Sequence, residues 1–461
     1  MSAISTVYIY MKFDSINPYN GEVVGSYKET TKAELSEILD STATAFDKWR
    51  KVPLNERTRL LANAGKVLRD NVDRYAKMIT LEMGKPIAES RAEVKKCALA
   101  CDYYSENAAD FLADQHIKTE ASQSFVRHNP IGCVFAVMPW NFPFWQVFRF
   151  AAPTLTSGNT AILKHAKNVF GCATMIAEVF EKAGYPKNVF QNAFIGHDKA
   201  EMIIAHSAVK AVTLTGSEKA GSAIAQLAGK HLKKSLLELG GSNAFVVLAD
   251  ADMDKTIATA VNARMMNTGQ SCIAAKRFII EEKIYDEFVE KFTKAVIELK
   301  SGDPLDEDTQ IGPLARIDLA ETAQKQVKDS IKKGAKLLLG GKQLDAYHEP
   351  TILGDVKPGM PAFDEETFGP VAAIIKAIDI EQAFKLSQAT DFALGISVCT
   401  ENIKKALEYV DYVSDGAYFV NDLVKSDPRL PFGGQKNSGY GRELSRDGMM
   451  EFINRKTVFV K

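Results

Sequence analysis

From residue 130 to about residue 421, segments typical of strands alternate with segments typical of helices. A first series runs from IGCVFAVM to NAFVVL, and a second, from about residue 254, includes KRFIIEE and VAAIIKAI. Strands that alternate with helices of about ten to fifteen residues predict βαβ units around a parallel sheet. Two such series predict two α/β lobes, and the cleft between them is the natural position of an active site.

Helical periodicity dominates the chain before this alternation. Thr31 and Glu34 form a capping-box pattern, and helical spacing then continues to about residue 113. The polar stretch at residues 115–129 interrupts it with an alternation that predicts a hairpin. A chain of 461 residues is long enough for two or three domains.

The charge balance gives no sign of a nucleic-acid or membrane partner. The formal net charge is −1, so no broad basic surface is expected. No apolar run approaches the ~18–20 residues that span a bilayer. Residues 1–22 lack the basic region and the long apolar region of a signal peptide.

The six cysteines are scattered along the chain. Cys97 and Cys101 lie four residues apart in a helical pattern, where we expect them to pack rather than to bond. No spacing is typical of a zinc site or of a disulfide framework, so no metal is expected. A reducing cytoplasm fits this pattern best.

Cys272 is the first candidate for chemistry. It follows Gly269, Gln270 and Ser271, which is typical of a polar turn rather than of an apolar stripe. A reactive thiolate needs partial exposure and nearby groups that stabilise negative charge. The segment alone also fits a small buried side chain, which is the usual place of a free cysteine.

Glu238 lies in the apolar run LLELGG, where burial of a carboxylate is costly unless it has partners or a chemical role. Desolvation raises the pKa of such a group, which suits a general base. The following Gly240 and Gly241 allow a ligand to approach the backbone closely. A glutamate on an edge strand in a surface ion pair is the alternative.

Asn141 lies in PWNFP, a loop fixed by two prolines directly after a predicted strand. A rigidly held amide at this place can donate to a developing oxyanion. A structural turn asparagine fits the segment equally well.

Thr215, Gly216 and Ser217 end one predicted strand and begin a helix. Gly216 permits the tight turn, and the N-terminus of the helix offers N–H groups to a phosphate. The segment is not GxGxxG, so a helix capped by serine remains an equal alternative.

Together these segments resemble the aldehyde dehydrogenase superfamily over nearly the whole chain. The motifs follow in the order PWNFP, LTGS, LELGG, NTGQSC, EETFGP (365–370) and PFGGQKNSGYGRE (431–443). The 34 residues from Glu238 to Cys272 also match that family's separation of base and nucleophile. Each motif is weak alone, whereas the ordered set is specific.

The resemblance implies a role for each matching residue. Cys272 is the expected nucleophile, Glu238 is the general base, and the Asn141 side chain forms the oxyanion hole with the Cys272 backbone N–H. The implied reaction oxidises an aldehyde to a carboxylic acid with NAD or NADP, through a thiohemiacetal and a thioester. The expected contacts of the cofactor are Trp140, Lys164, Lys167, Thr215, Gly216, Ser217, Leu239, Gly240, Glu366 and Phe368.

The resemblance also implies the domains. Residues 1–114 and 130–238 are expected to form a Rossmann-like cofactor domain, and residues 239–445 an α/β catalytic domain. Residues 115–129 and 446–461 are expected to form a small β element that joins a homodimer or a homotetramer.

Lys167 bears on the choice of cofactor. Many NAD-preferring relatives have a glutamate three residues after the Lys164 position, where it accepts from the adenosine ribose. A carboxylate there repels a 2′-phosphate, whereas a lysine attracts one. We therefore predict a preference for NADP with NAD still usable. The alternative is that Lys167 points into solvent.

For the substrate, the sequence resembles the shorter bacterial succinate-semialdehyde dehydrogenases. Arg149 and Ser426 match residues that bind the distal carboxylate of the substrate in such proteins, and a guanidinium fork suits a carboxylate. For Arg149 an ion-paired helix residue is the alternative. Glutarate semialdehyde, glycolaldehyde and aliphatic aldehydes are rival substrates. Acyl transfer to coenzyme A and a noncatalytic homologue are further alternatives, which the presence of Glu238 and Cys272 disfavours.

The sequence departs from such relatives at three places. Met266 stands where some of them have a second arginine for the substrate. Ile273 and Ala274 follow Cys272, so a neighbouring redox cysteine is absent. Phe150 replaces a lysine that pairs with the Glu443 position in many members, which puts a proton relay through Glu443 in doubt.

Overall fold

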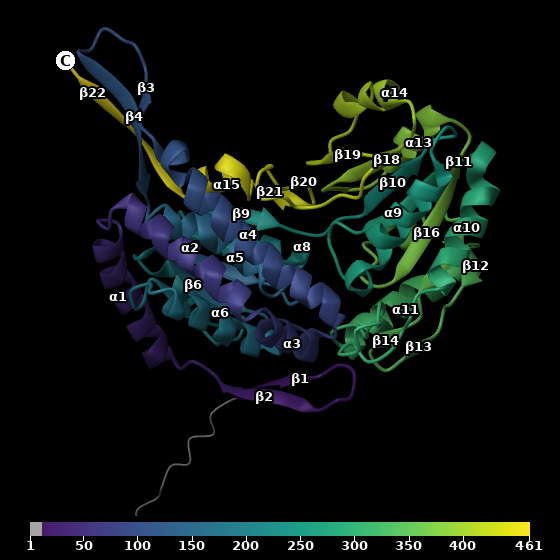
Figure 1. Cartoon of the computed structure of the whole chain (residues 1–461), viewed down its shortest axis with the longest axis horizontal. Helices are drawn as coiled ribbons and strands as arrows, with labels where there is room; N and C mark the ends of the chain where they lie inside the picture. Colours follow the sequence, from purple (N-terminus) through teal and green to yellow (C-terminus); the bar gives the residue numbers. More distant parts are fainter. Residues whose placement is uncertain (1–11) are drawn as a thin grey trace, which may run out of the picture.

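The computed structural model describes residues 12–461 as two α/β lobes and a projecting sheet (Figure 1). Residues 1–11 lie outside the described residues. They include the start of the predicted cofactor domain and half of residues 1–22, the segment in which no signal peptide was expected. The predicted fold class is confirmed, because each lobe is built on a mostly parallel sheet.

The sheet of the first lobe has the strand order β21-β9-β8-β5-β6-β7. Its neighbours pair in parallel except β21, which runs antiparallel to β9 at the edge. The strands are β5 (Cys133–Met138), β6 (Thr160–His165), β7 (Phe190–Asn192), β8 (Val209–Thr215), β9 (Lys234–Glu238) and β21 (Gly439–Tyr440).

Helices pack on both faces of this sheet because its side chains alternate between them. Phe135 joins an apolar cluster with residues of α1, α7 and α8, whereas Ala136 joins a cluster with residues of α2 to α6. Thr31 and Glu34 form the predicted capping box at the start of α1. The helices are α1 (Lys32–Trp49), α2 (Leu54–Asp70), α3 (Val72–Met83), α4 (Ile87–Leu112), α5 (Trp145–Thr156), α6 (Phe170–Lys182), α7 (Ala200–Ala205) and α8 (Glu218–Lys230).

The sheet of the second lobe has the order β12-β15-β16-β11-β10-β18-β19 and is parallel except at β12. Its strands are β10 (Asn243–Val247), β11 (Ala275–Glu281), β12 (Lys336–Leu339), β15 (Thr351–Gly354), β16 (Val371–Ala377), β18 (Ile396–Cys399) and β19 (Tyr418–Val420). The helices are α9 (Met253–Met265), α10 (Tyr285–Ile297), α11 (Ile317–Lys332), α12 (Pro361–Asp364), α13 (Ile380–Ser387) and α14 (Ile403–Leu407).

Two segments lie in a different part of the fold from the one their local sequence suggested. NAFVVL, which continued the first alternating series, is β10 in the interior of the second sheet, inside the range 239–445 that the family resemblance predicted for the catalytic domain. β21 lies within the range predicted for the catalytic domain but closes the edge of the first sheet, and α15 (Ser445–Met450) follows it. A strand pattern specifies burial and period but not the partner strand, so long-range pairing decides both cases.

A small sheet of order β22-β4-β3 projects from the first lobe beside the C-terminus (Figure 1). β3 (Gln115–His116) and β4 (Gln123–Pro130) form the predicted hairpin, with one very short strand. β22 (Ile453–Val460) pairs along the whole of β4.

The shorter strands and 3₁₀ turns connect the main layers. They are β1 (Lys12–Ile16), β2 (Val23–Lys28), β13 (Gln343–Leu344), β14 (Tyr347–His348), β17 (Phe392–Ala393), β20 (Gln435–Lys436), η1 (Lys167–Val169), η2 (Met266–Gly269), η3 (Glu282–Ile284) and η4 (Val410–Tyr412).

Candidate active site

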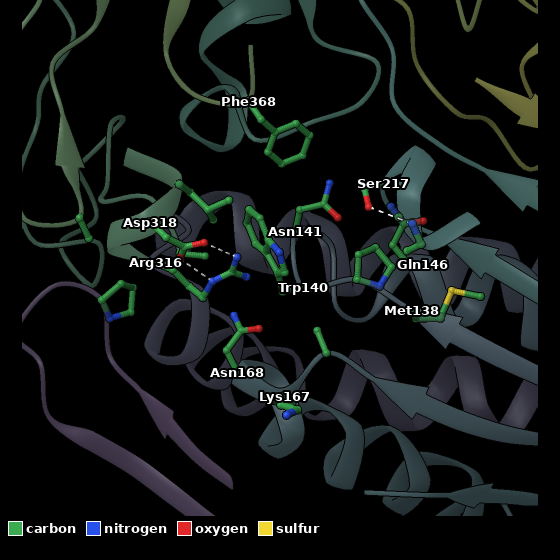
Figure 2. A pocket seen from close by; sticks show the side chains of 18 of the residues that line it. Met138, Trp140, Asn141, Gln146, Lys167, Asn168, Ser217, Arg316, Asp318 and Phe368 are labelled. Atoms are coloured by element: carbon green, nitrogen blue, oxygen red, sulfur yellow. Dashed lines mark hydrogen bonds and ion pairs between the residues drawn. The ribbon is translucent and has the colours of Figure 1, made fainter. Parts of the chain in front are cut away.

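A cavity of about 1140 Å³ lies where the carboxyl ends of the first lobe's strands face the second lobe. This is the place where parallel α/β sheets bind ligands. Figure 2 shows Trp140, Asn141 and Ser217 of the first lobe at this cavity together with Phe368 of the second. The predicted residues among its lining are Trp140, Asn141, Lys164, Lys167, Thr215, Gly216, Ser217, Leu239, Gly240, Cys272, Glu366 and Phe368. Glu238, Arg149 and Ser426 lie outside this lining.

The turn after β8 presents the start of a helix to the cavity. Ser217 is the N-cap of α8, and its Oγ accepts from the Ala220 N–H at 3.3 Å. The Gly216 N–H donates to the Glu238 carbonyl at 2.9 Å, which ties this turn to β9. The free N–H groups at the first turn of α8 therefore face a space that suits a phosphate.

Two lysines lie near the end of β6. Lys164 is buried, and burial, followed by the charge of Lys167, lowers the pKa of its amine to about 8. The exposed Lys167 also lines the cavity, and its Nζ lies 4.6 Å from the centre of the Phe13 ring. Neither lysine forms an ion pair with a carboxylate among residues 12–461. Both lysines therefore line the cavity, and their contact with a cofactor stays a prediction.

Gly240 and Glu366 meet at the opposite wall. The Glu366 carboxylate accepts from the Gly241 N–H at 3.0 Å, and a Cβ built on Gly240 would lie 2.7 Å from its second oxygen. A side chain at residue 240 would therefore displace Glu366. Phe368 stands edge-on to Trp140 with the ring centroids 5.7 Å apart, so these two aromatic rings border the same cavity (Figure 2).

The loop that carries Cys272 is held in an uncommon backbone conformation. Asn267 and Thr268 have φ values of 55° and 52°, in the left-handed region that non-glycine residues rarely adopt. Such conformations persist where surrounding contacts fix them, and they gather at functional sites. The buried Arg264 donates to the Gly269 and Gly369 carbonyls, both at 2.6 Å.

Asn267 connects this loop to Asn141. Its side-chain amide donates to the Asn141 carbonyl at 2.8 Å and to the Gln270 carbonyl at 3.1 Å. The Asn141 amide also donates to the Gln270 carbonyl at 3.1 Å. An amide nitrogen carries two hydrogens, so Asn141 keeps a second donor while the first fixes its orientation. The sequence reasoning missed Asn267, although it lies inside the NTGQSC motif.

Cys272 is partly buried and lines the cavity. Burial raises the pKa of its thiol to about 11, while the charges of Lys276 and Arg149 act in the opposite direction. Lys276 donates to the Cys272 carbonyl at 2.7 Å and to Glu366 at 3.1 Å. A thiol in this state is protonated at neutral pH, so nucleophilic attack needs a base. Lys276 was also missed, because a lysine in a strand pattern usually points to solvent.

Glu238 ends β9 and is only 2 % exposed. Neither oxygen of its carboxylate has a hydrogen-bond partner among residues 12–461, and a surface ion pair is excluded by its burial. Desolvation raises the pKa of this carboxyl to about 8, with Glu443 adding to the rise and Arg149 opposing it. Because its pKa lies close to neutral pH, it is placed to exchange protons there.

Arg149 is an ion-paired helix residue, which is the alternative that the sequence left open. On α5 it forms a buried ion pair with Glu443, and its Nη2 donates to the Thr215 hydroxyl at 3.1 Å. Burial raises the pKa of the Glu443 carboxyl, and Arg149 opposes that rise. Glu443 therefore has an arginine partner in place of the lysine that Phe150 replaces. Whether Arg149 contacts substrate stays a prediction.

Ser426 lies beside two donors from the first lobe. Its hydroxyl oxygen accepts from the indole N–H of Trp145 at 3.1 Å and from the Lys96 amine at 2.8 Å. Lys96, on α4, was not a predicted site residue, because single lysines on helices are ordinary surface residues.

The described chain offers no resident metal site and no membrane span. No group of three or more His, Cys, Asp or Glu side chains within residues 12–461 could hold a metal ion. No helix in this range is long and apolar enough to cross a membrane. All six cysteines, which fall within it, are free thiols, and Cys97 and Cys101 are buried in α4 as expected.

Residues 9–458 match the aldehyde dehydrogenase family. A probable succinate-semialdehyde dehydrogenase [NADP(+)] of Synechocystis sp. is 46 % identical over 98 % of this chain and 100 % of its own. The succinate semialdehyde dehydrogenase [NAD(P)+] Sad of Escherichia coli is 44 % identical over 96 % of this chain and 97 % of its own. The crystal structure of succinic semialdehyde dehydrogenase from Streptococcus pyogenes in complex with NADP+ superposes with a TM-score of 0.95 at 36 % identity, covering 97 % of this chain and 99 % of that one.

The chain therefore belongs to the aldehyde dehydrogenase family, as its ordered motifs predicted.

Proposed function

We propose that this protein oxidises succinate semialdehyde to succinate and prefers NADP as the hydride acceptor. The observation that carries the proposal is that Cys272, Asn141 and Glu366 meet in one cavity with two lysines that lack carboxylate partners in the described chain. The relatives named for this activity, at 44–46 % identity, support the same reaction.

The cavity fits a dinucleotide in three respects. The start of α8 offers backbone N–H donors for the pyrophosphate, and the bare backbone at Gly240 leaves room beside Glu366. Lys167 supplies positive charge at the lining for the 2′-phosphate of NADP. The chemistry that NADP supplies when bound is acceptance of a hydride from the substrate carbon.

Cys272 and Asn141 act in the first half of the reaction. The Cys272 thiol first gives its proton to a water molecule, and the thiolate then attacks the aldehyde carbon, forming a C–S bond and placing negative charge on the carbonyl oxygen. The second amide hydrogen of Asn141 and the Cys272 N–H donate to that oxygen. Loss of hydride from the carbon then leaves a thioester on Cys272.

Glu238 acts in the second half. Its carboxylate takes a proton from a water molecule, and the resulting hydroxide attacks the thioester carbon. The C–S bond breaks, the acid leaves, and the Cys272 sulfur leaves as thiolate. The buried position of Glu238, with no hydrogen-bond partner among residues 12–461, supports this role, because a hydrogen-bonded carboxylate is a weaker base.

We also propose that the projecting sheet joins subunits, giving a homodimer or homotetramer. β22 is an edge strand, and its exposed Phe459 and Val460 would be covered by a second copy. Native mass measurements on the chain and on a Phe459→Asp variant test this, and an unchanged mass would contradict it. The free buried thiols support a cytoplasmic location.

A panel of aldehydes with NADP and NAD tests the proposed reaction through the absorbance of the reduced cofactor. We expect the highest kcat/KM for succinate semialdehyde with NADP. Butanal has the same chain length without the carboxylate. Equal kcat/KM for the two aldehydes would contradict recognition of a carboxylate, and a higher kcat/KM with NAD would contradict the cofactor preference.

A further inference from the structure

We propose that Lys96, together with the Ser426 hydroxyl, binds the distal carboxylate of the substrate. This inference rests on the proposed function, and it assigns the direct ionic contact to a residue of α4 rather than to Arg149. Three features support it: the arrangement of Lys96, Ser426 and Trp145, the absence of an ion-pair partner for Lys96 among the described residues, and the large apolar cluster to which Trp145 belongs and against which Cys272 packs.

The arrangement of three side chains suits the binding of an anion: Lys96, Ser426 and Trp145. The Lys96 Nζ lies 4.3 Å from the centre of the Trp145 ring and donates to Ser426 at 2.8 Å. Ser426 already accepts from both neighbours, so its own hydrogen is available for a further acceptor. Lys96 keeps two more N–H hydrogens. A carboxylate has two oxygens and accepts from a hydroxyl and an ammonium at the same time.

Lys96 is a partly buried cation with no ion-pair partner in the described part of the chain. The charged and titratable groups near it are Glu93 and Cys97 on α4, Arg149 on α5, and Asp427. Glu93 is paired with Lys85, and Asp427 with Arg429 at 2.7 Å. Burial and the charge of Arg149 lower the pKa of the Lys96 amine to about 8. An unpaired cation in this position gains stability from a ligand anion.

Arg149 is poorly placed for the same contact. Its guanidinium is 2 % exposed and already pairs with Glu443. Turning it toward a substrate would leave the Glu443 carboxylate buried and unpaired, which is costly. Lys96 therefore supplies the positive charge that Arg149 does not offer.

Trp145, which contacts both Lys96 and Ser426, belongs to the large apolar cluster of the first lobe. Phe432 belongs to the same cluster, and Cys272 and Ile273 pack against it. Trp145 also begins α5, four residues after Asn141. An apolar surface of this kind suits an aldehyde that ends in a carboxylate. It contacts the methylene groups of the substrate, while hydrogen-bond donors bind the aldehyde oxygen and the carboxylate. The substrate class is thus a short ω-oxo carboxylate.

The test measures kcat/KM for succinate semialdehyde and for butanal with NADP in the full-length protein. We expect the ratio of the two values to fall by about 30-fold in Lys96→Met, since one charge-assisted contact is lost. Lys95→Met is the matched control, because Lys95 is the exposed neighbour on α4, and its ratio should equal that of wild type. Lys96→Arg should recover part of the ratio.

A second readout does not depend on Lys96→Met. The wild-type ratio should fall as the pH rises through about 8, where Lys96 loses its charge, whereas Lys96→Arg should keep its ratio to higher pH. If Lys96→Met does not fold, this pH dependence of the kcat/KM ratio tests the role of Lys96 instead.

The outcomes separate the two proposals. If wild type selects succinate semialdehyde and neither Lys96→Met nor rising pH lowers the ratio, the role of Lys96 is overturned and the proposed reaction stands. If wild type treats both aldehydes alike, the proposed reaction fails and the inference fails with it.

Discussion

Replacement of Glu238 by glutamine should separate the two halves of the reaction. Glutamine keeps the size of the side chain but cannot take a proton from water. Acylation of Cys272 should still release one reduced cofactor per active site as a rapid burst, after which turnover should slow by about 10²–10⁴-fold, the usual contribution of a general base. Rapid mixing of enzyme, NADP and aldehyde, followed by absorbance, measures burst and steady rate separately.

The structure also sets the pH dependence of the wild-type steady rate. With the pKa of Glu238 raised to about 8 by desolvation, about a tenth of the carboxyl is ionised at pH 7 and about nine tenths at pH 9. A base acts in its ionised form, so the rate limited by deacylation should rise about tenfold over that range. The slow turnover of Glu238→Gln should lack this rise.

Glu37→Gln is the matched control, because it makes the same substitution at an exposed residue of α1 that does not line the cavity. Its burst and pH profile should match those of wild type. The reasoning is refuted if Glu238→Gln shows no burst, or if it turns over at the wild-type rate with the same pH profile.

Three further predictions concern the nucleophile, the cofactor and the buried ion pair. Cys272→Ala should abolish oxidation but retain NADP binding by calorimetry, and substantial turnover would refute the covalent mechanism. Lys167→Glu should lower kcat/KM with NADP more than with NAD, because a carboxylate repels the 2′-phosphate; an unchanged cofactor ratio would show that Lys167 does not contact it. Arg149→Met should lower the free energy of unfolding by about 3–5 kcal/mol, because Glu443 is left buried without its partner. Adding Glu443→Gln to that variant should recover part of the loss in urea unfolding, and no recovery would contradict the pairing.

The lining of the candidate cofactor cavity was largely predictable. Short motifs at the carboxyl ends of strands, or in the loops that face them, contain Trp140, Thr215 and Glu366. A strand–turn–helix pattern within a few residues of the sequence is enough to predict such positions. The two mostly parallel sheets followed from the same alternation of segments. The far end of the site was not predictable in this way. Lys96 lies 330 residues from Ser426, and nothing in a helical pattern shows which exposed lysine will meet a distant serine.

By itself the sequence determined the α/β class, the motifs around Cys272, Glu238 and Asn141, and the family. These depend on periodicity and on residues close together in the chain. Only the tertiary structure decided that β21 returns to the first sheet, that Arg149 pairs with Glu443, and that Lys96 meets Ser426. Strand partners and buried charge pairs depend on the free energy of the whole packed chain. Burial of a polar or charged group is costly without a partner, so each pairing depends on residues that are far apart in the sequence.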